Sequence, residues 1–415
     1  MHNCHMYINR LLAGYILKAS RSFPVVLLTG PRQSGKTTLL RKISEDKRNF
    51  VSLDDLVLRN LAINDPKLFF QRFKPPLVID EIQYAPGLLS YIKLLVDEKA
   101  TKLKKANGLF WLSGSQNFTL MDNVSESLAG RVAIMKLLGC SHYEYSNDVP
   151  VDKQKPFFTK GAKISGTPLN VNKLFKFILR GAMPKLLADK KVDAEQYYSS
   201  YVQTYIERDI RGQIGAGSLM AFESFIRLLA ARATQLLNMA SLAQEIGVSL
   251  NTVKSWVSLL EKTFQIYILR PYHSNLNKRE IKTPKVYFLD TGLLCYLTQW
   301  QDSATALAGP MAGAIFENWV VSELIKSYWH RAKEAPFYFY RTKEGIEIDL
   351  FCVEANKIIA SEIKLSATPN IGSIQNLARL VSKKINIKEE WVFSQSEAML
   401  PLTSKITVFP ASCIF

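Results

Sequence analysis

The chain has 415 residues, of which 47% are apolar and 21% charged, as in ordinary globular proteins, so it is long enough for two or three domains. We find no apolar run as long as a membrane span and no signal-peptide pattern at the start, and therefore predict a cytoplasmic protein without a membrane partner. Lysine and arginine exceed aspartate and glutamate by 53 to 36, a formal charge of +17, which favours a polyanionic partner such as DNA or RNA. The five cysteines are scattered, which indicates a reducing compartment rather than a disulfide framework.

A phosphate-binding loop follows the first predicted strand. The apolar run FPVVLLT predicts a buried strand, GPRQSGKT follows it, and TLLRKISED then reads as a helix, which is the order that a P-loop requires. Its glycines let the backbone amides turn toward phosphate, its lysine brings a charge to the terminal phosphates, and its threonine hydroxyl suits Mg²⁺. A chance match in a glycine-containing loop is disfavoured by the strand and helix on either side. The predicted cofactors are therefore ATP and Mg²⁺, and the predicted binding residues are Gly30, Pro31, Arg32, Gln33, Ser34, Gly35, Lys36, Thr37 and Thr38.

Polar residues also follow the next two predicted central strands. The run PPLVIDEIQ ends in Asp80, which suits the Mg²⁺ shell together with Thr37, and in Glu81, which suits the base that activates water. The alternative is a strand followed by an acidic helix cap. After a helix around 88–105, the run GLFWLSGSQ ends in Ser115 and Gln116, which could sense the γ-phosphate or hold the attacking water.

Arg131 closes the segment ESLAGRV, just before a further strand, VAIMKLLG. An arginine so placed can reach a nucleotide bound to a neighbouring subunit, as an arginine finger does. The alternative is a surface arginine near a helix end. The first reading predicts a homo-oligomer, with a ring as one form.

The middle of the chain reads as a linker and helices, followed by a helix-turn-helix. Residues 146–172 show no sustained period, and the helical patterns from 173 to 240 fit the small helical lid of an ATPase module by position. In residues 239–269, one helix ends at Gly247 and Ser249 can cap the next.

The second of these helices, with the hairpin after it, makes a winged-helix pattern. Lys254 is predicted to face outward beside Asn251 and Ser255, and the wing HSNLNKREIKTPK is basic. A helix in the major groove with the wing on phosphates predicts DNA binding, whereas a winged helix used for protein contacts is the alternative. The predicted nucleic-acid contacts are Lys254, Lys278, Arg279, Lys282 and Lys285.

The C-terminal region reads as an amphipathic helix over 313–329, then strands over 337–341, 347–354 and 357–365, a helix and a last strand. This order resembles a diverged member of the PD-(D/E)XK nuclease-like fold.

Three acids and a lysine lie at the positions that such a fold uses. Glu362 and Lys364 are two apart on a strand and share a face, Asp349 lies on the paired strand, and Glu317 lies on the preceding helix. Glu317, Asp349 and Glu362 could bind Mg²⁺, and Lys364 could orient water or stabilise the transition state. The alternative is a hairpin with one solvated face whose cross-strand charges pair, or a nuclease fold that has lost cutting.

The motifs GPRQSGKTTLL, VSLDD, VIDEIQ, SGSQ, ESLAGR, YIERDI and FENWVVSEL together resemble AAA-type P-loop ATPases. They are similar, more narrowly, to a prokaryotic family in which a domain of unknown function follows the ATPase. The segment RGAMP at 180–184 departs from that family's pattern. The resemblance implies an α/β fold with an ATPase core over 1–145, a linker and helical lid over 146–238, a winged helix over 239–290 and a nuclease-like domain over 291–415. It implies an ATP-hydrolysing, DNA-associated protein that could also be a nuclease; the alternatives are a nucleotide-gated DNA-binding switch and a protein-docking ATPase.

Overall fold

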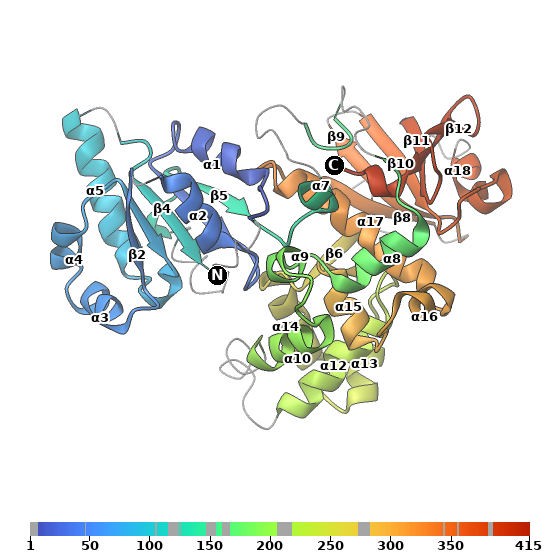
Figure 1. Ribbon diagram of the computed structural model, residues 1–415, viewed down its shortest axis with the longest axis horizontal. Coiled ribbons are helices and arrows are strands. Elements are labelled where there is room, and N and C mark those ends of the chain that lie inside the picture. Colours follow the sequence, from blue (N-terminus) through green and yellow to red (C-terminus); the bar gives the residue numbers. More distant parts are fainter. Residues whose placement is uncertain are drawn as a thin grey trace.

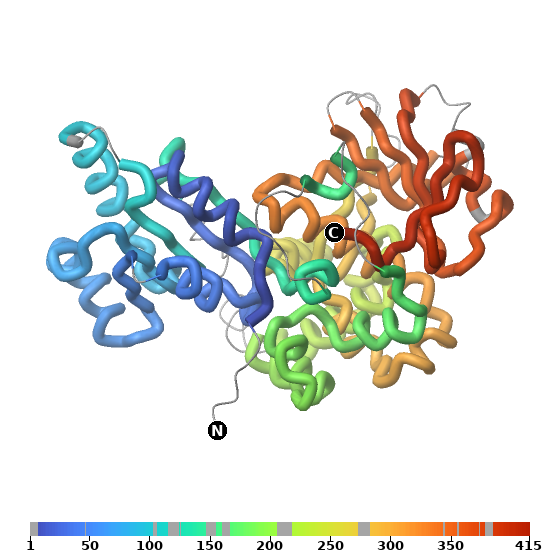
Figure 2. Tube along the Cα trace, turned by 45° about the horizontal axis from the view of Figure 1, so that its top comes forward, coloured from blue at the N-terminus to red at the C-terminus, as the bar shows by residue number. Residues whose placement is uncertain are grey.

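The computed structural model describes residues 7–45, 47–103, 106–114, 124, 126–146, 155–159, 167–205, 218–272, 283–342, 345–354, 357–380 and 385–415. The chain folds into two parts that lie side by side. The N-terminal part contains the elements up to β5, and the larger second part contains the elements from α7 onward (Figure 1). The tube in Figure 2 shows the same division from a second direction.

A parallel five-stranded sheet forms the centre of the N-terminal part, in the order β2-β3-β4-β1-β5. Its strands are β1 (Val25–Thr29), β2 (Asn49–Ser52), β3 (Leu77–Asp80), β4 (Phe110–Gly114) and β5 (Val132–Lys136). Successive side chains of a strand point to opposite faces, so Val25 and Leu27 enter one apolar core while Val26 and Leu28 enter another. The predicted α/β core with a parallel sheet is therefore confirmed.

Helices cover both faces of this sheet. They are α1 (Leu12–Ala19), α2 (Lys36–Ser44), α3 (Leu56–Asn64), α4 (Pro66–Arg72) and α5 (Leu88–Leu103), with a short 3₁₀ turn at Ile82–Tyr84. Leu12 of α1 and Leu39 of α2 pack in the core with Val26, whereas Phe69 of α4 and Leu88 of α5 pack in the core with Val25.

One aspartate of the VSLDD motif has a structural task. Asp55 is the N-cap of α3, and its carboxylate accepts hydrogen bonds from the backbone amides of Val57 and Leu58. It thereby satisfies donors that the first turn of a helix leaves without partners.

The second part begins with a run of helices, and further helices follow between its strands. They are α7 (His142–Ser146), α8 (Val171–Arg180), α9 (Pro184–Ala188), α10 (Ala194–Tyr205), α12 (Leu219–Ala231), α13 (Met239–Ile246), α14 (Leu250–Lys262), α15 (Thr291–Leu297), α16 (Ser303–Ala308), α17 (Ala312–Trp329) and α18 (Gln375–Leu380). As predicted, α13 ends at Gly247, whose backbone is left-handed at φ 76°, and Ser249 caps α14 by accepting from the amide of Thr252 at 3.1 Å.

A mixed eight-stranded sheet completes the second part, in the order β12-β13-β11-β10-β9-β8-β6-β7. Its strands are β6 (Ile266–Pro271), β7 (Lys285–Phe288), β8 (Phe337–Arg341), β9 (Glu347–Glu354), β10 (Lys357–Ile363), β11 (Ile387–Ser394), β12 (Leu400–Pro401) and β13 (Ile406–Pro410). The hairpin β6–β7 is not a free wing: β6 also pairs with β8 in parallel, through Arg270 opposite Tyr338. The predicted boundary at residue 291 therefore does not separate two sheets.

Helix α17 differs from the predicted amphipathic helix. The apolar face through Phe316, Val320, Leu324 and Tyr328 is buried as predicted, but the opposite side is buried too, including Glu323, which is 1% exposed. One side of the helix lies against the large sheet, and the other side lies against the segment that joins the two parts. In that segment the amide of His142 donates a hydrogen bond to Glu323 at 2.7 Å. Helix α17 is the central helix of the second part (Figure 1).

In the part of the chain that the structure describes, no helix combines the length and the apolar character needed to cross a bilayer.

Candidate functional site

The P-loop lies at the carboxyl end of β1, and two glycines make its shape possible. Gly30 has φ 154°, and a Cβ there would lie 2.0 Å from the carbonyl oxygen of Leu137, so no other residue fits. Gly35 has φ 91° and precedes the first turn of α2, so the amide end of this helix faces the loop. The local sequence therefore builds an anion-binding turn at the carboxyl edge of the sheet.

The ammonium of Lys36 is held inside this turn. Its Nζ donates to the carbonyl oxygens of Gly30 at 3.1 Å and Pro31 at 2.8 Å, and the residue is 6% exposed. Ser34 tightens the same turn by donating from its hydroxyl to the carbonyl of Pro31. The lysine charge thus lies at the place where the terminal phosphates of a nucleotide would be.

Asp80 and Thr37 lie together, as the sequence predicts. The Thr37 hydroxyl donates to the Asp80 carboxylate, with its Oγ1 3.0 Å from each oxygen. Asp80 is 2% exposed, and the hydroxyls of Ser113 and Ser52 also donate to it. Because hydroxyl and carboxylate oxygens are the donors that Mg²⁺ prefers, this pair fits the metal that the sequence predicts.

Sequence reasoning missed Ser113 and Ser52. The sequence contained a signal for both serines. Each serine lies near the carboxyl end of a parallel strand next to β3, and the carboxyl ends of parallel strands meet at one edge of a sheet.

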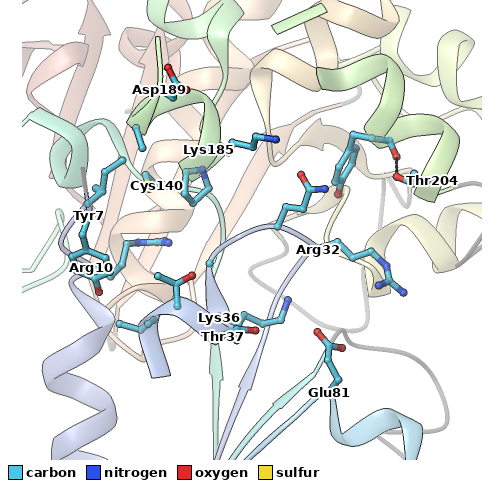
Figure 3. Close-up of a pocket in the computed structure, with 18 of the residues that line it drawn as sticks. Tyr7, Arg10, Arg32, Lys36, Thr37, Glu81, Cys140, Lys185, Asp189 and Thr204 are labelled. Carbon is cyan, nitrogen blue, oxygen red and sulfur yellow. Dashed lines mark hydrogen bonds between the residues drawn. The ribbon is translucent and has the colours of Figure 1, made fainter. Parts of the chain in front are cut away.

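Glu81 follows Asp80 directly and turns in another direction. Its backbone is left-handed at φ 58°, and its carboxylate accepts from the side-chain amide of Gln83. Figure 3 shows the Lys36 ammonium and the Glu81 carboxylate pointing into one space. Ser115 and Gln116, the predicted sensors, lie outside the described residues.

A cavity of about 840 Å³ lies over the P-loop. Its floor is formed by Arg32, Lys36, Thr37 and Thr38, and its far wall by the helices α9 and α10 of the second part. The volume is within the range of small-ligand sites. The predicted helical lid thus faces the nucleotide-binding loop.

One hydrogen bond and one close approach place α10 and α9 against the P-loop. The hydroxyl of Tyr197 on α10 donates to the side-chain oxygen of Gln33. Pro184, the last residue of the RGAMP segment, lies near Gly35, where an added Cβ would be 3.6 Å from its ring. Arg180 takes no part in the cavity, because its guanidinium donates to the backbone carbonyls of Leu186, Asp189 and Val192.

A buried ionic network supports the loop, and one of its members, Arg10, also lines the cavity. The Arg10 guanidinium donates to the carbonyl of Ser34 at 2.8 Å and to the Glu144 carboxylate at 3.2 Å. The ring Nδ1 of His330 lies 3.1 Å from the same carboxylate. Burial alone raises the pKa of Glu144, but Arg10 and His330 outweigh it and hold that pKa well below its usual range. Burial lowers the pKa of His330.

Arg131 lies away from the P-loop of its own chain. It precedes β5, whose first residue, Val132, lies beside Val25, whereas the P-loop follows the far end of β1, about 13 Å further along the strands. Its guanidinium makes two hydrogen bonds to the carboxylate of Asp97, at 2.7 and 3.0 Å. It therefore does not face its own nucleotide cavity.

On the helix-turn-helix, α14 has the orientation that the sequence predicts. Val253, Trp256, Val257 and Leu260 are buried, while Lys254, with Asn251 and Ser255, is exposed. Lys278, Arg279 and Lys282 lie outside the described residues.

The prediction that Lys285 contacts nucleic acid is wrong. The sequence predicts a phosphate contact on the wing, but the residue is 3% exposed, because β7 joins the large sheet and directs this side chain into it.

The acids predicted for the C-terminal site gather around that lysine. Its Nζ lies 2.6 Å from Glu347, 3.7 Å from Glu317 and 3.9 Å from Asp349. Beside this group, the Nζ of Lys364 lies 2.6 Å from Glu362 and 3.5 Å from Asp349. The fold therefore brings together Glu317, Asp349, Glu362 and Lys364. It adds Lys285, which the sequence analysis assigned to the wing, and Glu347.

Burial controls the proton affinities of this cluster. It raises the pKa of Glu317 to about 7 and that of Glu362 to about 8, in both cases with help from the nearby Asp349. Burial lowers the pKa of Lys285, but the carboxylates of Glu317, Asp349 and Glu347 outweigh it, so the net shift is upward. The carboxyl groups of Glu317 and Glu362 therefore hold their protons more strongly than solvated carboxyl groups do.

The chain matches three known family descriptions. Residues 22–146 match the family described as AAA domain, residues 171–304 match Domain of unknown function (DUF8612), and residues 312–414 match Domain of unknown function (DUF4143). The N-terminal part thus matches the AAA domain family and the C-terminal part matches a domain of unknown function, in the order that the resemblance predicts. The middle match includes both the predicted lid and the predicted winged helix.

Two curated relatives are uncharacterized proteins, one of Mycobacterium bovis and one of Mycobacterium tuberculosis. Each relative is 27% identical to this chain, and the alignment covers 99% of this chain and 86% of the relative. Among solved structures, a Walker-type ATPase of Pyrococcus abyssi aligns with a TM-score of 0.45 and 14% identity, over 70% of this chain and 96% of that one.

Proposed function

We propose that the protein binds ATP with Mg²⁺ in the cavity over the P-loop and hydrolyses it. One observation carries this proposal: Lys36, Thr37, Asp80 and Glu81 converge at the carboxyl edge of a parallel sheet, beside a cavity of about 840 Å³.

Each residue has a definite task in this proposal. The P-loop amides and Lys36 bind the phosphates, while Thr37 and Asp80 hold the metal. When bound, Mg²⁺ neutralises charge on the phosphate oxygens. The Glu81 carboxylate accepts a proton from the attacking water and orients it.

The proposal is tested by nucleotide binding and ATP hydrolysis of Lys36→Ala beside the wild type. Lys47→Ala is a matched control, because its side chain is 80% exposed and is outside the cavity. We expect Lys36→Ala to lose hydrolysis and Lys47→Ala to keep it. Equal hydrolysis by the wild type and Lys36→Ala would contradict the proposal.

We further propose that DNA is the partner and that the nucleotide state controls its binding. The exposed face of α14, with Asn251, Lys254 and Ser255, supports this, as does the formal charge of +17. A protein-docking ATPase is the competing function. If this competing function is correct, the protein does not bind DNA even at low salt, where a protein that contacts phosphates binds DNA most tightly.

Metal-dependent cutting by the C-terminal sheet has less support than a switch that binds DNA without cutting. The order and grouping of Glu317, Asp349, Glu362 and Lys364 favour cutting, but Lys285 lies among the carboxylates. Incubation of linear, supercoiled and single-stranded DNA with Mg²⁺ or Mn²⁺ distinguishes the two functions. Cleavage that is lost in both Asp349→Ala and Glu362→Ala would establish cutting, and binding without cleavage would support the switch.

A further inference from the structure

A lysine ammonium lies where the carboxylates of the C-terminal sheet converge. Lys285 Nζ is within 3.9 Å of Glu317, Glu347 and Asp349, which come from α17 and β9. The lysine side chain is 4% exposed, so it is enclosed with these acids rather than extended into water.

The sheet itself fixes this placement. Lys285 lies opposite Leu269 in the antiparallel pair of β6 and β7, and β6 is anchored on β8. Tyr287 is two residues further along β7 and therefore on the same face, and its hydroxyl donates to Glu317 at 2.7 Å. Two neighbouring side chains of β7 thus hold one carboxylate of α17.

The carboxylates next to Lys285 have other partners as well. Glu347 lies 3.1 Å from the Arg341 guanidinium, and Asp349 accepts a hydrogen bond from the amide of Ile363 at 2.9 Å. Lys364 is engaged with Glu362 at 2.6 Å. Lysines and an arginine therefore already compensate the acids that a metal would require.

A divalent cation does not fit this arrangement. Mg²⁺ needs oxygens in near-octahedral geometry at about 2.1 Å, and a buried ammonium among the same carboxylates would repel it. Within the described ranges, no three His, Cys, Asp or Glu side chains are placed to hold a metal ion. The metal that a nuclease-like fold implies thus disagrees with the residues present.

We propose that the Lys285 ammonium is a built-in counter-ion that takes the place of a divalent cation in the C-terminal sheet. The wild-type cluster accordingly takes up no Mg²⁺ or Mn²⁺, and removal of the lysine charge opens a cation site that depends on Glu317 and Asp349. This inference concerns the C-terminal sheet and stands or falls independently of ATP hydrolysis.

The experiment measures Mn²⁺ binding to the nucleotide-free full chain by electron paramagnetic resonance, together with the shift in melting temperature. The proteins are the wild type, Lys285→Met, the charge-preserving Lys285→Arg, and Lys285→Met combined with Glu317→Gln. We expect Lys285→Met to bind Mn²⁺ at least tenfold more tightly than the wild type, and Mn²⁺ to raise its melting temperature. Lys285→Arg and the double variant should resemble the wild type.

Two results would overturn the proposal. One is wild-type protein that binds Mn²⁺ in a way that Asp349→Asn or Glu362→Gln abolishes; this measurement decides the matter even if Lys285→Met does not fold. The other is a folded Lys285→Met that binds Mn²⁺ no better than the wild type. Because ATP hydrolysis is assayed separately through Lys36→Ala, failure of one proposal is distinguishable from failure of the other.

Discussion

The guanidinium of Arg10 donates to the carbonyl oxygen of Ser34 at 2.8 Å, so a residue two positions before α1 holds the P-loop. The same guanidinium binds Glu144, which His330 contacts at the end of α17. A continuous polar network therefore links the nucleotide-binding loop to the central helix of the second part. All three ionisable side chains are at most 4% exposed.

Arg10→Met should destabilise the protein strongly. The substitution leaves the Glu144 charge buried with reduced compensation, and loss of one member of a buried ion pair costs about 3–5 kcal/mol. Thermal unfolding should show a clear fall in melting temperature, whereas Arg72→Met, at an exposed site on α4, should leave it nearly unchanged. Similar curves for the two variants would show that the network contributes little.

Glu81→Gln should bind ATP but hydrolyse it at least about 100-fold more slowly, because the amide keeps the size of the side chain and loses its basicity. Nucleotide binding and phosphate release, measured on the same preparation, separate the two effects. A variant with the wild-type turnover number would mean that another group activates the water.

Arg131 can be tested as a residue that acts on a neighbouring subunit. If Arg131 acts in trans, Arg131→Ala lacks hydrolysis but keeps an intact cavity, because the residue lies at the start of β5, away from its own P-loop. A mixture of Arg131→Ala and Lys36→Ala should then regain activity, since the second protein supplies the arginine and the first the nucleotide site. If the mixture stays inactive although sedimentation shows mixed oligomers, Arg131 does not act in trans.

His142 should make the protein less stable in mild acid. Burial lowers the pKa of His142 to about 4, below the value of about 6.5 in unfolded chains. The unfolded state therefore binds the proton first, and stability is lost as the pH falls below 6.5. The expected loss between pH 7.5 and pH 5 is about 2 kcal/mol.

The comparison is the pH dependence of unfolding by denaturant for the wild type and for His142→Phe. The phenylalanine keeps ring contacts with Phe177 and Trp319 and removes the titration. If the free energy of unfolding depends on pH in the same way in both proteins, His142 is not the cause. His330, whose pKa burial also lowers, adds a loss in the same direction to both proteins.

Lys254→Ala should weaken DNA binding and reduce the slope of log affinity against log salt by roughly one, as expected for one lost phosphate contact. Lys67→Ala on α4 removes the same charge from an exposed position of the N-terminal part and is the matched control. Equal effects of the two changes would point to a general charge effect rather than to α14.

Local sequence was sufficient to locate the P-loop and the turn between α13 and α14. A P-loop is one continuous segment whose glycines, lysine and threonine act through the backbone of the same turn, so spacing alone identifies it. The acids were recognisable because Asp80 ends a buried strand and Glu81 follows it, and parallel strand ends meet at one edge. Gly247 and Ser249 likewise mark helix ends through contacts within a few residues.

Tertiary structure alone decided what lies next to Lys285, what encloses the cavity and what surrounds α17. Lys285 belongs to a basic loop in the sequence, and only the pairing of β6 with β8 turns it into the sheet. Arg10 and Glu144 are 134 residues apart, and no periodicity relates positions that meet across two parts of a fold. A pattern reports which side of an element avoids water, whereas the identity of the partner depends on how the elements pack.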